Sequence, residues 1–137
     1  ELGNSSQRFW GGFTQSFDMQ HPLLNFTSWY SNHIRLDRRQ IVYLDHCLFI
    51  HRGLLDANLA IPKVEIFEDT ALSLQLRRMA AACRLPAKST TSAIRFQRNG
   101  FVRQSLMNQV LKLGFLLGVS PERMNRWYEK GLGLNQP

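Results

Sequence analysis

The chain has 137 residues, the size of one domain, and its 44% hydrophobic content can fill a core. Its formal net charge is +7, and the absence of low complexity, internal repeats and heptads argues against a disordered chain or a coiled coil. Cys47 and Cys83 match no metal-binding or redox spacing, and residues 1–8 do not read as a signal peptide. We therefore expect two free, buried thiols in a reducing compartment and a cytoplasmic location.

The positive charge is concentrated in one part of the chain. Residues 1–69 carry 6 basic and 8 acidic side chains, whereas residues 70–121 carry 8 basic side chains and no acid. A block without acids favours a negatively charged partner. Nucleic acid, an anionic membrane surface and a phosphorylated ligand all meet this description, and charge does not choose among them.

The N-terminal third of the chain predicts a strand followed by a helix. Three phenylalanines of one parity surround Gly11-Gly12 in residues 9–17, which is typical of a strand with a bulge or a close backbone approach. The glycine pair would also let a ligand approach the main chain. Apolar residues with helical spacing follow over residues 23–36, and the charged residues 35–39 are predicted to form a loop.

Residues 40–52 contain two apolar runs on either side of Asp45-His46. A polar pair inside an apolar segment must find partners or line a site, so Asp45 and His46 are candidate site residues. We expect residues 46–51 to form a strand, in which His46 and His51 would face opposite sides. The four histidines therefore do not predict a metal site.

The acidic pair Glu68-Asp69 opens a helical pattern of apolar residues. Both carboxylates should lie at the helix start, where unpaired N–H groups and the helix dipole favour negative charge. We expect this helix to continue through residues 80–82 and to end before Pro86. Two interpretations stay open: an ordinary acidic helix start, or a carboxylate that acts as a general base at the edge of a pocket.

The remaining elements are a strand over residues 88–93, a turn at Asn99-Gly100 and a long helix over residues 101–118. The wide apolar stripe of that helix suits packing on two sides or a membrane interface, but the helix is too short and too charged to span a bilayer. Ser120 and Pro121 begin a last helix. The predicted fold class is α/β, a thin mixed sheet with several helices. The small sheet and the missing initiator Met lead us to expect part of a longer protein.

Four blocks, taken in order, resemble the bacterial nucleotide-sugar glycosyltransferases of the inverting, GT-A-fold family two. They are an aromatic-glycine strand (9–13), an Asp-containing block that ends in an arginine (45–52), a proline-containing approach to Glu-Asp (61–69) and a Ser-Ala-x-Arg-aromatic segment (91–96) with Gly100. The ending over residues 116–123 is also similar. Leu44 and His46 stand where the family has Gly and Gln.

The resemblance implies an inverting sugar transfer from a nucleotide-sugar donor to an acceptor hydroxyl. Asp69 would be the general base that takes the proton of that hydroxyl, with Glu68 beside it shaping the site. Arg95 would match an arginine that steadies the departing nucleotide diphosphate, because its forked donors suit phosphate oxygens.

Other positions are carried over with changes. Phe96 replaces a tryptophan and keeps a smaller aromatic wall, whereas Ile94 replaces an arginine and removes one charge from that block. Asp45, His46 and Arg52 would bind substrate.

The resemblance also implies that the chain is the C-terminal, acceptor-side half of such an enzyme, since the family's nucleotide-binding half and Asp-x-Asp motif precede these blocks. Residues 1–137 would be one domain or a fragment, with an acceptor and catalytic-base region (9–100) and C-terminal helices (101–130). The full enzyme would need Mg²⁺ or Mn²⁺, with no metal bound by this chain alone. We expect the isolated chain neither to bind the sugar nucleotide tightly nor to turn over.

The alternative function is a basic binding module for nucleic acid or for an anionic membrane surface. Nucleic acid is the less favoured partner, because the basic residues are spread over several elements and no nucleic-acid-binding motif is present. Peripheral association of residues 101–119 with the inner membrane is compatible with transferase activity. A Ser-His-Asp hydrolase is not supported, since there is no nucleophile elbow.

Overall fold

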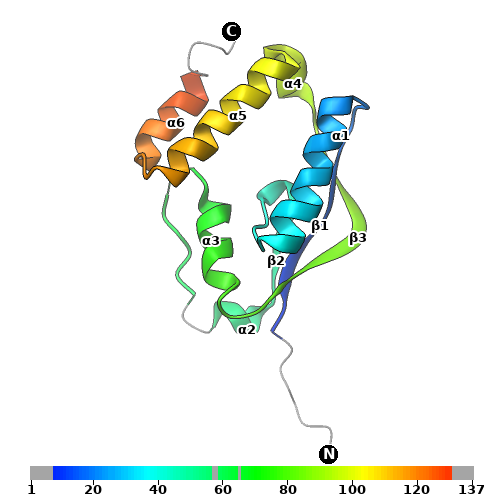
Figure 1. Cartoon of the computed structure of the whole chain (residues 1–137). Coiled ribbons are helices and arrows are strands. Elements are labelled where there is room, and N and C mark those ends of the chain that lie inside the picture. The colour runs from blue at the N-terminus through cyan, green and yellow to red at the C-terminus, as the bar shows by residue number, and fades with distance from the viewer. Residues whose placement is uncertain (1–7, 57–58, 65, 131–137) are drawn as a thin grey trace, which may run out of the picture. The chain divides into compact units, whose positions relative to one another are not determined.

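The computed structural model describes residues 8–56, 59–64 and 66–130. Its elements in chain order are β1 (Trp10–Phe17), α1 (Pro22–Trp29), η1 (Tyr30–Arg38), η2 (Leu44–His46), β2 (Phe49–Ile50), α2 (Arg52–Leu55), α3 (Glu68–Leu76), β3 (Ala82–Thr91), α4 (Ile94–Asn99), α5 (Phe101–Leu116) and α6 (Pro121–Lys130) (Figure 1). This mixed α/β content, with a thin mixed sheet and several helices, confirms the coarse fold prediction.

The elements divide into two compact units. The first unit holds the described residues as far as Pro62 together with Asp69–Thr91, and the second holds Lys63–Glu68 and the described residues from Ser92 onward. The division passes between Glu68 and Asp69, so the two residues of the acidic pair belong to different units. The functional boundary that the sequence predicts near residue 100 stays a prediction.

The sheet of the first unit has the strand order β2-β1-β3. β1 pairs with β2 in antiparallel and with β3 in parallel orientation, and the register shifts between Phe13 and Thr14. Because Phe13 pairs with Leu85 and Thr14 with Lys88, Pro86 and its neighbour are the extra residues of a bulge. Proline is tolerated there, since it lies on an edge strand where no ladder donor is required.

Pro86 was therefore misread from the sequence, because it lies inside a strand and does not mark the end of a preceding helix. α3 ends at Leu76, before the predicted residues 80–82. Tertiary hydrogen bonds explain the early end: the Trp10 indole donates to the Ala80 carbonyl at 2.7 Å, and the Ala82 N–H donates to the Gln40 side chain. These bonds draw the chain into β3, which starts earlier than the predicted residue 88.

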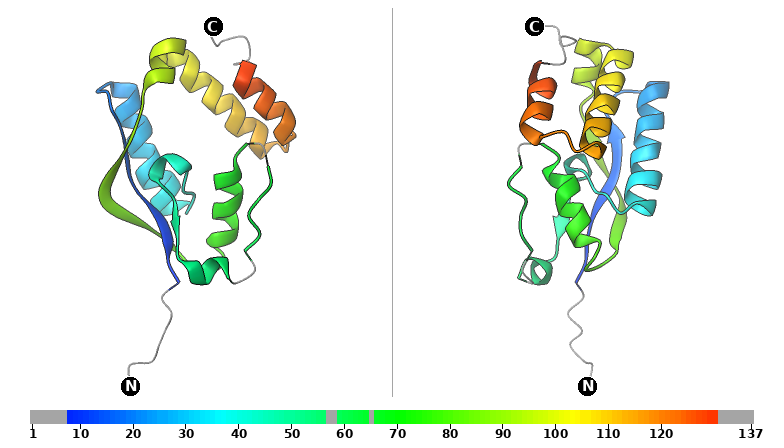
Figure 2. Two further views of the ribbon diagram at one scale, coloured as in Figure 1. Left: turned by 180° about the vertical axis from the view of Figure 1, so that it is seen from behind. Right: turned by 60° about the vertical axis from the view of Figure 1, so that its left-hand side comes forward.

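The predicted helix over residues 23–36 is confirmed, and it continues without interruption from α1 into the π-helical η1. His21 caps its start by accepting a hydrogen bond from the Leu23 N–H at Nδ1 (3.2 Å), and Pro22 occupies the first turn, where its missing N–H costs nothing. The loop predicted over residues 35–39 was wrong, because η1 extends to Arg38. Figures 1 and 2 show α1 and η1 running alongside the sheet; α1 contacts β1, and η1 contacts both β1 and β3.

The core of the first unit is a cluster of buried apolar side chains from the sheet, η1, α2, α3 and the segment that precedes η2. Its members are Trp10, Leu36, Val42, Leu54 and Leu76. Trp10 is fully buried and also uses its indole N–H, so the aromatic ring fills the core without leaving an unpaired donor.

The second unit is built on α5 and α6, with α4 packed on α5. Met107, Leu111 and Met124 form its buried core, and Phe67 reaches that core with its ring centroid 5.2 Å from that of Phe115. Ser120 Oγ accepts the N–H of Arg123 at 3.4 Å, which confirms the predicted start of the last helix. Within the described part of the chain, none of the helices combines the length and the apolar character needed to cross a membrane.

Candidate functional site

Asp69 is held in one orientation at the start of α3. Its Oδ2 accepts the main-chain N–H of Leu44 at 3.1 Å, and its Oδ1 accepts the main-chain N–H of Thr70 at 2.6 Å. The hydroxyl of Thr70 lies 3.4 Å from the same Oδ1. The side chain is half-buried, whereas Glu68, one residue earlier, is exposed. The predicted helix start is thus confirmed, and Asp69 is the better-ordered carboxylate of the pair.

Tyr43 connects Asp69 electrostatically to the segment that leads into η2. Burial raises the pKa of the Tyr43 phenol; the guanidinium of Arg35 lowers it, while the carboxylates of Asp69 and Asp45 raise it further. A hydrogen bond with the Thr70 side chain also lowers this pKa. The phenol therefore stays protonated at neutral pH.

Arg35 supplies the positive charge of this group, and sequence reasoning missed it. Its guanidinium carbon lies 4.7 Å from the centroid of the Tyr43 ring and 5.2 Å from that of Tyr30, so two aromatic faces hold it by cation–π contacts. The only signal in the sequence was a cluster of charges that read as a solvated loop. Arg35 becomes part of the site because the helix continues through it.

Asp45 is a carboxylate held in an environment that opposes its charge. Burial raises its pKa, and His46, Arg35 and the backbone N–H groups of Asp45 and His46 act against that rise. Its Oδ1 is buried and has no hydrogen-bond partner among the described residues. Its main-chain carbonyl accepts the hydroxyl of Ser89 at 2.7 Å, which ties η2 to β3. A buried acceptor without a partner is costly and marks Asp45 as a place where a donor is missing.

His46 is fully buried, and both of its ring nitrogens have protein partners. Nδ1 lies 2.8 Å from the Phe13 carbonyl oxygen, and Nε2 lies 2.9 Å from the Ser31 hydroxyl. Because a carbonyl can only accept, Nδ1 carries the proton, and in the neutral ring Nε2 accepts from Ser31. The ring joins β1, η1 and η2.

The predicted strand over residues 46–51 was wrong apart from the two residues of β2. Asp45 and His46 instead form the 3₁₀ turn η2, and Cys47 follows in the left-handed region at φ 50°. Cys47 and Cys83 are free but exposed, so the expected burial of the two thiols was wrong. The hydrogen bonds of the His46 ring explain this outcome, because they can form only when the polar pair turns inward toward β1 and η1.

The two glycines of β1 allow the protein itself to approach closely. A Cβ on Gly11 would overlap the Cys83 carbonyl of β3, and a Cβ on Gly12 would lie 2.7 Å from the Cβ of His46 and 2.8 Å from Val42 Cγ1. A close approach therefore explains this pair, with neighbouring backbone and side chains as the groups that approach. A bulge at the glycines, the other interpretation of the sequence, was wrong, because Gly11 and Gly12 pair in register with Cys83 and Arg84.

Arg52, the last candidate in the first unit, begins α2 and has a largely exposed side chain. Its Nε lies 3.9 Å from Asp56 Oδ2, a surface ion pair one helical turn away. Such a pair contributes little to stability, so the guanidinium can exchange Asp56 for another anion at small cost.

Arg95 and Phe96 belong to the second unit with Glu68. Arg95 is exposed on α4, and its guanidinium carbon lies 4.4 Å from the centroid of the Tyr128 ring. Phe96 is buried, with its ring centroid 6.3 Å from that of Phe101. Phe96 therefore packs inside its unit, while Arg95 presents a charge that an aromatic face orients.

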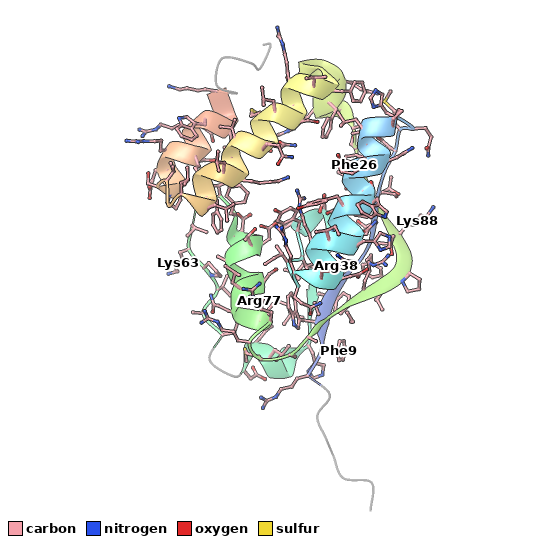
Figure 3. The ribbon with its side chains drawn as sticks, in the orientation of Figure 1. Phe9, Phe26, Arg38, Lys63, Arg77 and Lys88 are labelled. Atoms are coloured by element: carbon pink, nitrogen blue, oxygen red, sulfur yellow. The ribbon has the colours of Figure 1, made fainter. Side chains whose placement is uncertain are left out.

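The basic side chains of the acid-free block are divided between the two units. In the first unit, Arg84 donates to both carboxylate oxygens of Asp37, at 3.0 and 2.9 Å, so this charge is neutralised within the protein. Arg77 and Lys88 are exposed, the former next to α3 and the latter on β3 (Figure 3). The block is therefore not one continuous strip on a single element.

No three His, Cys, Asp or Glu side chains come together as metal ligands do in the part of the chain that the structure describes. Comparison of the chain with family models, curated proteins and solved structures found no match.

Proposed function

We propose that this chain supplies the acceptor side of an inverting sugar transfer, with Asp69 as the general base. The observation that carries the proposal is the pair of main-chain hydrogen bonds that orient the half-buried Asp69 carboxylate at 3.1 and 2.6 Å. A carboxylate has about four acceptor positions, so backbone donors can orient it while it receives a substrate proton. A general base needs this combination of fixed geometry and access.

The proposed reaction has one bond-forming and one bond-breaking event. The acceptor oxygen attacks the anomeric carbon of the sugar, its proton passes to Asp69, and the bond from that carbon to the nucleoside diphosphate breaks. General-base assistance of this kind contributes roughly a hundred- to ten-thousandfold in rate. Attack from the face opposite the leaving group inverts the anomeric configuration, as the family resemblance implies.

Asp45 and Tyr43 are proposed to recognise the acceptor. The buried Oδ1 of Asp45 has no partner among the described residues, and a substrate hydroxyl would satisfy it. The Tyr43 phenol keeps its proton, since burial raises its pKa, and could donate to an acceptor oxygen. We assign His46 a positioning role, because both ring nitrogens are engaged by the protein.

Arg95 is proposed to stabilise the leaving diphosphate, with the donor-binding half supplied from outside these 137 residues. This role is supported by the resemblance at residues 91–96 and by the exposed guanidinium of Arg95, which is held over the Tyr128 ring.

The test of Arg95 supplies the proposed donor-binding half together with this chain and follows sugar release from a nucleotide-sugar donor. Arg95→Lys should lower kcat roughly ten- to a hundredfold, because an ammonium cannot match the forked donors.

The matched control is Arg98→Lys, a similarly exposed arginine on the same helix. Its kcat should stay close to that of the wild type. Equal losses in the two variants would show that the effect is not specific to the Arg95 guanidinium and would contradict its assigned role. Sugar transfer by the isolated 137-residue chain would refute the proposal that the donor side lies elsewhere.

A further inference from the structure

The most exposed apolar side chains of the second unit lie along one face of α5 and its C-cap residue Leu117. Val102, Leu106, Leu113, Leu116 and Leu117 are between 56% and 79% exposed. We call these five residues the α5 stripe. Their spacing places them on one side of the helix over about 22 Å of its length, with the exposed Gln109 as the polar residue on that face.

The opposite face of α5 already has its partners. Gln104, Met107, Leu111 and Gly114 are buried, and a Cβ on Gly114 would lie 3.4 Å from the sulfur of Met124 in α6. The α5 stripe is therefore not needed for the core of its unit. An exposed apolar surface of this extent marks an interaction site.

Charges on the same helix indicate the partner. Arg103 follows Val102 and Lys112 precedes Leu113, so the two cations lie about a quarter turn to either side of the stripe. α5 contains no Asp or Glu, and residues 70–121 contain none either. An apolar face flanked by basic residues is the pattern of a helix that lies in the interface of an anionic bilayer.

The charge pattern also favours a bilayer over two other partners. A second copy packed symmetrically on the stripe would place Arg103 and Lys112 against the same cations of its partner, with no acid on α5 to compensate. The bases of a nucleic acid could not stack on the stripe, because all five of its side chains are aliphatic.

We propose that the α5 stripe docks on an anionic lipid surface, with Val102, Leu106, Leu113, Leu116 and Leu117 in the acyl boundary and Arg103 and Lys112 at the headgroups. This inference does not depend on the sugar-transfer proposal.

The test is co-sedimentation of the 137-residue chain with vesicles of phosphatidylglycerol and phosphatidylcholine, compared with pure phosphatidylcholine vesicles. The wild type should bind the anionic vesicles and lose affinity as salt is raised. Leu113→Ser/Leu117→Ser should lower the partition coefficient at least about tenfold, because less apolar area is buried. Arg103→Gln/Lys112→Gln should lower it roughly tenfold on anionic vesicles and leave binding to neutral vesicles unchanged.

The matched control is Leu55→Ser/Ile61→Ser, which removes exposed apolar side chains from the first unit and should bind as the wild type does. Circular dichroism and sedimentation velocity verify that each variant is folded and report its oligomeric state. The proposal is overturned if the wild type does not bind anionic vesicles, or if the stripe variant binds as well as the wild type. A dimer that dissociates in the stripe variant, without vesicle binding by the wild type, would assign the stripe to a second copy and overturn the proposal.

Discussion

The main-chain N–H of Leu44 donates a hydrogen bond to Asp69 Oδ2 at 3.1 Å, across 25 positions of the sequence. This bond joins η2 to the start of α3 and places the carboxylate next to the Asp45-His46 turn. Since Leu44 is exposed, water can replace the carboxylate as its partner. The bond therefore orients Asp69 more than it stabilises the fold.

A first prediction follows for stability. Asp69→Ala should lower the free energy of unfolding by only about 1 kcal/mol, because the N–H of the exposed Leu44 can bond to water instead. Asp69→Asn should cost less, since it keeps one carbonyl oxygen as an acceptor. Urea denaturation of the isolated chain measures both. A loss above about 3 kcal/mol for Asp69→Ala would assign this carboxylate a structural role.

Ser73 should be the more important side chain of α3 for stability. Its buried hydroxyl accepts the Val42 N–H at 3.0 Å and donates to the Val42 carbonyl at 3.2 Å. Ser73→Ala would leave both backbone groups buried without partners and should cost about 1–3 kcal/mol in urea denaturation. Ser105→Ala in α5 removes the same hydroxyl from a helix and should be neutral or slightly stabilising. Equal effects in the two variants would contradict the assignment.

Gly12→Ala should destabilise the first unit through overpacking. The added Cβ would lie 2.7 Å from His46 and 2.8 Å from Val42, and neither neighbour has a flexible end to move away. The expected loss is about 1–3 kcal/mol of unfolding free energy, with a shift of the His46 ring signals in NMR spectra. Unchanged stability and unchanged ring signals would contradict this prediction, because they would show that η2 can shift away from β1 without loss of stability.

Asp45→Asn should change how stability depends on pH. Burial raises the folded-state pKa of Asp45, so the folded protein binds this proton more tightly than the unfolded chain does. The wild type is therefore favoured while the carboxyl is protonated, and it loses that advantage as pH rises from about 4 through the raised pKa. The asparagine variant should be the more stable protein at neutral pH.

The measurement for Asp45 is urea denaturation of both proteins across this pH range. The difference in unfolding free energy should shrink toward zero below a pH of about 4, where both proteins carry a neutral side chain at this position. A difference that does not vary with pH would mean that Asp45 titrates normally. A less stable variant at neutral pH would mean that the charged form is favoured by the fold.

The sequence predicted the elements that depend on local patterns and missed those that depend on distant partners. The strand over residues 9–17, the helix from residue 23 and the cap at Ser120 follow from periodicity and capping chemistry, and all are present. The end of α3 depends on Trp10 and Gln40, which lie far away in sequence. Local propensity therefore favoured a longer helix than the one that forms.

The candidate site shows the same limit. Glu68-Asp69 and Asp45-His46 could be found because charged or polar pairs interrupt apolar patterns. Glu68-Asp69 lies at the predicted helix start, whereas Asp45-His46 lies in the turn η2 and not in the predicted strand. Arg35 and Tyr43 could not be found, since their importance arises only when η1 brings the guanidinium over the Tyr43 ring. The α5 stripe was visible as a broad apolar pattern, but only the packing of α6 shows which side of α5 stays exposed.

The central claim is tested most directly by turnover of the Asp69→Asn variant with the proposed donor-binding half supplied, measured beside the affinity for the nucleotide-sugar donor. The asparagine keeps the size and one acceptor of Asp69 but cannot take a proton, so kcat should fall at least about a hundredfold while the donor Kd stays near the wild-type value. Asp56→Asn, which neutralises an exposed carboxylate at the C-terminal cap of α2, is the control and should retain full activity. Wild-type turnover by Asp69→Asn would contradict the account and remove Asp69 from the role of general base.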